Sequence, residues 1–278
     1  MREFKRRGIS SAIAIVCLGS SAWGATGDHW IVSGWPQVDG TWLFDYTEGA
    51  ASATNPRVLN FSGNTASIMV SGLDFDNQGR LFAMGSSGFY EVNPANGDLT
   101  LRGAFGVGIE GSAGYDPVNN RFLVSDAFTA IEAVDLVNFT HTPIASISGI
   151  DDVSGIAVDG SGRIWFCAAN TNTTGICDLY ELQGSTPVNY GSMGVSAAGA
   201  VCDLDFDSAG NLTLVSGNNL YRVSTTFGSP TATLVSPFTN SQAIYSGIAL
   251  APVPEPGMML LAAAPLGLLA RRRKARHS

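Results

Sequence analysis

The chain has 278 residues, 45% of them hydrophobic, 14% charged and 33 of them glycine, a composition that excludes coiled coils and intrinsic disorder and favours an all-β fold. The formal net charge of −8 combines +3 in residues 1–24 and +4 in residues 254–278 with −15 in the residues between them. This acidic middle part contains no lysine, which excludes lysine-based catalysis there and argues against nucleic-acid binding, because acidic surfaces repel phosphate backbones.

Residues 1–24 predict a secretory signal peptide. Four basic residues lie near the start, an apolar run covers residues 9–20, and small residues follow it. Cleavage after Gly24 is preferred, with Ala22 and Ala25 as alternatives. The protein is therefore expected to pass through the Sec translocon and to be cut by signal peptidase.

The body, residues 25–252, repeats one pattern in which a short strand, an aspartate turn and a second apolar strand follow each other. The turn aspartates, spaced by 40, 43 and 48 residues, are Asp76, Asp116, Asp159 and Asp207. Third strands are predicted over residues 89–92, 131–134, 179–182 and 220–223, and fourth strands over 99–102, 143–147, 188–192 and 231–235. Four antiparallel strands per 40–48 residues are typical of a β-propeller blade.

The residues of these turns support the pattern. An aspartate at the first turn position accepts hydrogen bonds from the following backbone, and a residue that tolerates positive φ is needed shortly after it. Gly79, Gly162 and Gly210 satisfy that need, and Asn120 takes the same place in the second repeat.

The two ends of the body predict how the ring closes. Residues 246–250 match the first strand of a blade, and residues 29–33, 41–45 and 57–61 match the other three strands. We therefore expect five blades, the last built from both ends of the body, which hides edges that would otherwise pair with other chains. Six blades remain an alternative, although about 225 residues at ~45 per blade leave no room for a sixth.

The repeats resemble those of NHL and gluconolactonase-type propellers. The shared pattern is Gly-(Ile/Leu)-x-(Phe/Val)-Asp-x-x-Gly-(Arg/Asn)-Leu, and the resemblance covers most of residues 66–252. It implies the architecture, whereas propellers host many unrelated activities. Gluconolactonase-like enzymes use a divalent cation, but their ligand set does not match this chain residue by residue.

Carboxylates are the best candidates for a binding site. The loops expected at one mouth of the channel carry Glu110, Asp151, Asp152 and Asp203, with Asp126 nearby. Together they could hold Ca²⁺, which takes six to eight oxygen ligands, or Asp152 and Asp203 could form a glycosidase pair. The alternative is a set of separate, solvated loop acids.

Other side chains give weaker signals. Asp74 and Asp205 hold equivalent places on inner strands and are expected to accept hydrogen bonds from neighbouring backbone. No complete catalytic constellation is present, and only two histidines lie in the body.

The cysteines of the body leave two interpretations open. Cys167 and Cys177 flank the loop 168–176 and are read either as a disulfide across a hairpin or as two buried thiols. Cys202 is left over and is expected to be buried at the start of an inner strand.

The C-terminal segment, residues 253–278, has three consecutive parts. Val253, Pro254, Glu255 and Pro256 are followed by an apolar run over residues 257–270 and by a basic cluster that includes Arg271, Arg272 and Arg273. As a helix the apolar run spans about 21 Å, short of the ~30 Å hydrocarbon core, so a transient membrane contact is expected, with the basic cluster on the cytoplasmic side.

This tail resembles the PEP-CTERM sorting signal of Gram-negative bacteria. The resemblance implies cleavage by an exosortase near Pro254–Pro256 and a host that makes an exopolysaccharide or a biofilm matrix. A plain tail anchor is the alternative, but it would leave the Pro-Glu-Pro unexplained.

Together these features predict an exported cell-surface or biofilm-matrix protein. Its propeller is expected to bind glycan or protein partners without catalysis. A cation-dependent propeller hydrolase or lactonase with an acidic channel mouth is the alternative, and a purely structural matrix component is a third hypothesis.

Overall fold

The computed structural model describes residues 29–36, 41–61, 64–65, 70–85, 88–104, 112–125, 129–150, 152–170, 176–196, 202–238 and 243–251. Every regular element in these ranges is a β-strand. The same ranges contain no helix with the length and apolar character needed to cross a membrane. The predicted signal peptide and the apolar run at 257–270 lie outside the described residues.

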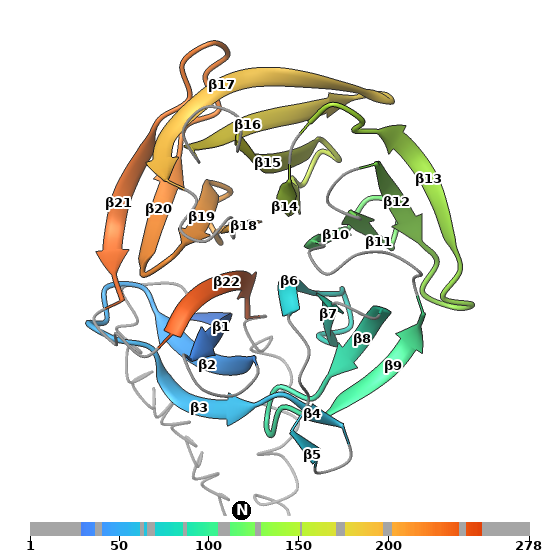
Figure 1. Cartoon of the computed structure of the whole chain (residues 1–278), viewed down its shortest axis with the longest axis vertical. Coiled ribbons are helices and arrows are strands. Elements are labelled where there is room, and N and C mark those ends of the chain that lie inside the picture. Colours follow the sequence, from blue (N-terminus) through green and yellow to red (C-terminus); the bar gives the residue numbers. More distant parts are fainter. Residues whose placement is uncertain are drawn as a thin grey trace, which may run out of the picture.

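Twenty of the described strands form five antiparallel sheets of four strands, set around a ring (Figure 1). Blade 1 consists of β22 (Ala243–Leu250), β1 (His29–Pro36), β2 (Trp42–Thr47) and β3 (Thr54–Val58). Blade 2 consists of β6 (Val70–Phe75), β7 (Leu81–Gly85), β8 (Gly88–Val92) and β9 (Leu99–Gly103). Blade 3 consists of β10 (Ser112–Asp116), β11 (Arg121–Ser125), β12 (Ala130–Val134) and β13 (His141–Ser146).

Blade 4 consists of β14 (Val153–Val158), β15 (Ile164–Asn170), β16 (Ile176–Gln183) and β17 (Thr186–Ser196). Blade 5 consists of β18 (Cys202–Phe206), β19 (Leu212–Ser216), β20 (Asn219–Val223) and β21 (Ala232–Pro237). A short hairpin, β4 (Asn60–Phe61) with β5 (Asn64–Thr65), lies between blades 1 and 2 in the chain. The all-β, five-bladed propeller predicted from the repeats is confirmed.

The closure of the ring is also as predicted. The C-terminal strand β22 is the inner strand of blade 1 and pairs with β1, where Trp30 lies opposite Leu250. The outermost strand of this blade begins earlier than expected, at Thr54, and also ends earlier, at Val58. It ends there because Asn60 and Phe61 pair with β5 instead. The fourth strand of blade 4 is longer than expected and runs over Thr186–Ser196.

The hydrophobic core lies between neighbouring sheets rather than inside a single one. The described residues form five buried clusters, one at each junction of two blades. The second strands are buried along most of their length, because both faces of a blade pack against other blades. This explains why the second strands read as continuous apolar runs instead of alternating.

The aspartate turns have the predicted geometry. The Asp76 carboxylate accepts hydrogen bonds from the backbone N–H groups of Gln78, at 2.9 Å, and Arg80, at 2.8 Å. Gly79 has a φ of 74° and Asn120 a φ of 51°, the left-handed region in which glycine and asparagine are favoured.

The two faces of the disc differ in what they carry. The turn face holds the aspartate turns that follow the inner strands, together with the start of β1 and the end of β22. The loop face holds the starts of the inner strands and the connections between second and third strands. Both ends of the described ring therefore leave from the turn face.

Inner strands of adjacent blades approach each other closely. A Cβ on Gly155 of β14 would lie 2.8 Å from the Cα of Asp203 on β18. A Cβ on Gly114 of β10 would lie 2.3 Å from the carbonyl oxygen of Ile156 on β14. Glycine at these two places is needed because real Cβ atoms do not come so near to backbone.

Candidate functional site

The structure places the predicted mouth acids in two groups. Glu110, Asp151 and Asp126 lie outside the described residues. Asp152 and Asp203 are described, and both are buried, with 3% and 0% of their surface exposed. Asp152 precedes β14 with a φ of 48°, an uncommon conformation for a residue other than glycine.

Asp203 lies at the seam between blade 5 and blade 1. Its carboxylate accepts hydrogen bonds from the N–H of Ile248 on β22, at 3.0 Å, and from the N–H of Leu204, at 2.9 Å. Burial raises the pKa of Asp203 well above its usual range, although these backbone donors lower it in part. The corresponding inner-strand positions of blades 2, 4 and 1 hold Gly72, Gly155 and Gly247, as the pairing with the second strands shows.

Two further inner-strand acids repeat this arrangement. Asp205 accepts the N–H of Leu250 on β22, at 2.6 Å, and Asp74 on β6 accepts the N–H of Tyr115 on β10, at 2.7 Å. The prediction that Asp74 and Asp205 bond to neighbouring backbone is therefore confirmed. An inner strand has one edge without a strand partner, and these carboxylates satisfy N–H groups along that edge.

The environment of these acids favours their protonated form. Burial raises the pKa of Asp205 to about 7, and the nearby Asp207 carboxylate acts in the same direction. Burial also raises the pKa of Asp74 well above its usual range, with the negative charge of Asp205 as the next cause. Both acids lie next to β22, one on each flanking strand. Because they are buried near other carboxyl groups, they hold protons more readily than surface carboxylates do.

The role of these three aspartates is therefore to connect the inner strands of neighbouring blades. Each carboxyl group joins the inner strand of one blade to that of the next, and its oxygens are engaged by backbone donors. Among the described residues, no three His, Cys, Asp or Glu side chains are grouped so as to hold a metal ion. The Ca²⁺ site predicted from Glu110, Asp151, Asp152 and Asp203 involves residues on both sides of the described boundary and stays a prediction.

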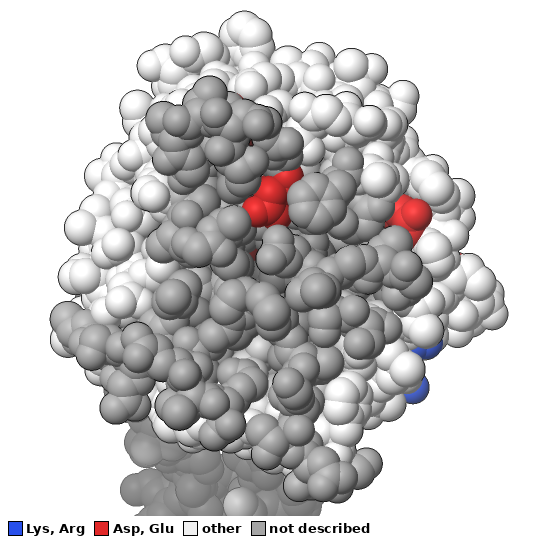
Figure 2. Space-filling view, in the orientation of Figure 1, with Lys and Arg blue, Asp and Glu red and all other residues white. Residues whose placement is uncertain are grey.

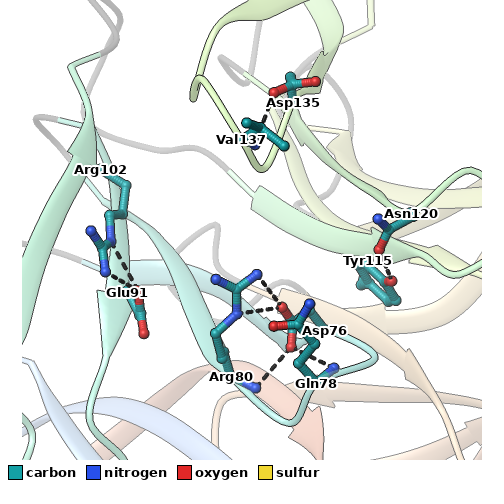
Figure 3. Close-up of polar contacts among 9 residues, drawn as sticks. All are labelled: Asp76, Gln78, Arg80, Glu91, Arg102, Tyr115, Asn120, Asp135 and Val137. Atoms are coloured by element: carbon teal, nitrogen blue, oxygen red, sulfur yellow. Dashed lines mark hydrogen bonds and ion pairs between the residues drawn. The ribbon is translucent and has the colours of Figure 1, made fainter.

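The turn face carries a second set of charged contacts. Figure 3 shows the Asp76 carboxylate with Gln78 and Arg80, where the Arg80 Nε donates at 2.7 Å. In blade 4, burial alone would raise the pKa of Asp159, but hydrogen bonds from Ser161 and Arg163 bring it down to about 2. These pairs hold the turns in place.

The same close-up shows two other polar contacts. Glu91 pairs with Arg102 across β8 and β9, and the Tyr115 hydroxyl donates to Asn120 at 2.8 Å (Figure 3). Figure 2 shows one face of the molecule, and acidic and basic side chains are visible at only a few places on the described part of that face.

The cysteines meet in a way that the sequence did not reveal. Cys167, Cys177 and Cys202 are unbonded and fully buried. The Sγ of Cys202 lies 3.0 Å from that of Cys167 and 3.4 Å from that of Cys177. The cysteine that seemed left over is thus the centre of the cluster, and only the contact between blades 4 and 5 shows this.

Comparison with known proteins identifies the fold of the chain but assigns the chain to no family. No protein-family model matches the chain, and no curated protein matches it. A chain from the crystal structure of a nidogen–laminin complex is similar, with 12% identity and a TM-score of 0.58 over 81% of this chain and 99% of that chain.

Two further solved structures show weaker similarity. A protein of unknown function from Bacteroides caccae has 10% identity and a TM-score of 0.46, over 82% of this chain and 100% of that chain. A streptogramin B lyase has 13% identity and a TM-score of 0.40, over 62% of this chain and 56% of that chain. At such identities the likeness to the nidogen–laminin chain supports the fold alone, and the molecule is a β-propeller.

Proposed function

We propose that this protein is exported, processed by an exosortase at its PEP-CTERM-like tail, and displayed at the cell surface or in a biofilm matrix. There its propeller binds a glycan or a protein partner without catalysis. The signal peptide and the tail direct the protein to this location, and the ring of blades supplies a rigid support for the binding loops.

The observation that carries the proposal is the position of the two ends of the described ring. His29 begins β1 and Leu250 ends β22, and both lie on the turn face. A tail that follows residue 251 leaves from that face, so the loop face points away from whatever holds the tail. Connections that vary between blades then face the partner, as binding loops on rigid scaffolds do.

The chemistry of the channel supports binding over hydrolysis. Asp203 and Asp205 accept backbone N–H groups of β22, at 3.0 and 2.6 Å, and thereby join blade 5 to blade 1. A glycosidase needs two carboxyl groups that face a substrate across an open space. In the predicted pair, Asp152 with Asp203, the Asp203 carboxylate faces backbone donors instead.

The proposed export and processing are tested by fractionating a Gram-negative host that carries an exosortase. We expect the full chain to appear as a shortened protein in the envelope and in the medium. Replacing Pro254, Glu255 and Pro256 by alanine should keep the longer form in the inner membrane, whereas Pro252→Ala is the matched control and should behave as the wild type. A full chain that stays in the cytoplasm, or a triple variant processed like the wild type, contradicts the proposal.

The binding role is tested on the processed protein taken from the medium. We expect it to sediment with the host's exopolysaccharide or to retain a surface protein in a pull-down. Hydrolysis of lactones or arabinan-type glycans that depends on added Ca²⁺ would instead favour the lactonase or hydrolase hypothesis. Absence of both binding and hydrolysis would leave the structural hypothesis.

A further inference from the structure

Three thiols from two blades meet inside the protein. Cys167 lies on β15 and Cys177 on β16, both in blade 4, and Cys202 begins β18 in blade 5. The exposed fraction of each side chain is 0%. The cluster belongs to the core between the two blades and takes no part in the proposed binding loops.

Strand register explains why Cys202 is the common partner. Cys167 lies opposite Leu179, and Cys177 lies opposite Ala169, so the two cysteines of blade 4 are diagonal neighbours on one face of the sheet. Each of their Sγ atoms contacts the Sγ of Cys202, at 3.0 Å for Cys167 and 3.4 Å for Cys177.

A glycine makes the contact between the blades possible. Gly155 on β14 lies opposite Cys167, and a Cβ on it would be 2.9 Å from the Cys167 Sγ. Any larger residue at this position would push the Cys167 side chain away from blade 5. The missing side chain therefore lets Cys167 reach Cys202 over β14.

The contacts of Cys202 distinguish it from the other two thiols. The Cys202 sulfur is contacted by the Cys167 and Cys177 thiols and by the Ser154 hydroxyl, the last at 3.0 Å. These contacts lower the pKa of Cys202, whereas burial raises the pKa of Cys167. Cys202 is the neighbour that both other thiols share, so a disulfide with either of them contains Cys202.

We propose that Cys202 forms a disulfide with Cys167 that joins blade 4 to blade 5, and that Cys177 is a third thiol able to exchange into it. The two sulfurs need to move about 1 Å closer to reach the ~2.05 Å of a covalent bond. The loop closed by the bond spans the connection between the two blades. This inference concerns the covalent structure of the ring and does not depend on the proposed function.

The oxidant is an external disulfide, carried by a thiol-oxidising protein or a small molecule, and it reacts during folding, before blades 4 and 5 pack together, because the three thiols are buried in the folded ring. The Cys202 thiolate attacks one sulfur of that disulfide and releases the other as a thiol, which leaves a mixed disulfide on Cys202. The Cys167 thiolate then attacks the Cys202 Sγ and releases the second thiol of the oxidant. Two protein thiols lose two protons and two electrons, and the oxidant gains them.

Exchange within the cluster needs no further oxidant. The Cys177 thiolate attacks the Cys202 Sγ and releases Cys167 as a thiolate, so one disulfide replaces another. Both disulfides contain Cys202, and a bond between Cys167 and Cys177 is not expected.

A peptide map of the full chain, refolded in the presence of oxidised glutathione, tests the proposal. Free thiols are alkylated after unfolding, and the chain is cut with trypsin and with a protease specific for glutamate. Cleavage after Arg163, Glu181 and Arg222 places Cys167 and Cys177 on peptide 164–181 and Cys202 on peptide 182–222. We expect most of the protein to give these two peptides joined, with one alkylated cysteine in the first.

Three outcomes overturn the proposal. One is a peptide 164–181 closed on itself by a Cys167–Cys177 bond, and another is three alkylated cysteines after refolding with the oxidant. The third is a stoichiometric zinc or copper ion in the protein as purified, because the thiolates would then be metal ligands.

Serine variants separate the partners of Cys202. Cys177→Ser is the matched control and should keep the joined peptides, whereas Cys202→Ser should lose them. Cys167→Ser should yield peptides joined through Cys177, and their absence would overturn the exchange. Fragmentation of the joined wild-type peptides shows whether Cys167 or Cys177 carries the alkyl group, so the wild-type map decides the main point even where a variant fails to fold.

Discussion

Asp205 makes the stability of the ring depend on pH, and Asp205→Asn should remove that part of the dependence. The side chain accepts the N–H of Leu250 at 2.6 Å and the N–H of Phe206 at 2.6 Å. The two donors use different oxygens, Oδ2 for Leu250 and Oδ1 for Phe206, and asparagine keeps only one of them. The substitution therefore removes the titrating group and one hydrogen bond. The lost hydrogen bond lowers the stability at every pH, so the titration is read from the change of the stability difference with pH.

The sign and size of the effect follow from the pKa of Asp205, which burial raises to about 7 from a reference value of 3.8. Between these two values the folded state binds a proton that the unfolded state does not, so the free energy of unfolding falls as pH rises. From pH 5 to pH 7 this single group lowers the free energy of unfolding by about 2 kcal/mol. Asp74 and Asp203 also have raised pKa values and act in the same direction, so the measured quantity is a difference between proteins.

Urea unfolding at pH 5, 6 and 7, followed by tryptophan fluorescence, measures the effect. Wild type should gain more stability on acidification than Asp205→Asn, by about 2 kcal/mol between pH 7 and pH 5. Asp135→Asn is the control, because Asp135 is exposed and backbone hydrogen bonds lower its pKa, which keeps it charged over this range. Equal pH dependence in wild type and Asp205→Asn would refute the reasoning.

Two other substitutions and one truncation probe the packing of the ring by the same unfolding assay. Arg57→Ala should lower the free energy of unfolding by about 3 kcal/mol, because the Arg57 side chain is 6% exposed and donates to both carboxylate oxygens of Asp45, at 2.8 and 3.0 Å. An unchanged unfolding midpoint would contradict this. Gly155→Ala should lower the free energy of unfolding by about 2 kcal/mol or more, because the new Cβ would lie 2.8 Å from the Cα of Asp203. Wild-type stability of this variant would mean that β14 and β18 can move apart. A chain that ends at residue 242 lacks β22 and should lose the cooperative unfolding transition, whereas a chain that ends at residue 251 should keep it.

The repeat pattern was sufficient to predict the architecture, because each blade is specified by local signals. An aspartate turn such as that of Asp76, with Gly79 after it, fixes one hairpin, and the hairpin fixes which residues face the neighbouring sheets. The closure by β22 followed from counting strands, since three strands at one end and one at the other complete a blade. These inferences need only near neighbours in the sequence.

The contacts between blades could not be predicted in this way. Asp203 has the sequence context of a mouth acid, yet it lies buried against β22, because the approach of the inner strands decides its surroundings. Cys202 is separated from Cys167 by 35 residues, and only the close approach at Gly155 brings their sulfurs to 3.0 Å. Side chains that act across a seam depend on the relative position of two sheets, which no pattern within one repeat encodes.

The strand that closes the ring, β22, is held on both sides by hydrogen bonds between side chains and backbone. From β18, the Asp203 and Asp205 carboxylates accept the N–H groups of Ile248 and Leu250. On its other flank, the Ser246 hydroxyl donates to the carbonyl oxygen of Val70 on β6, at 3.1 Å. These contacts end at Leu250, so a cut beyond residue 251 leaves every one of them in place, whereas loss of β22 removes them together. The ring can therefore close before the proposed cleavage near Pro254–Pro256 and stay closed after it.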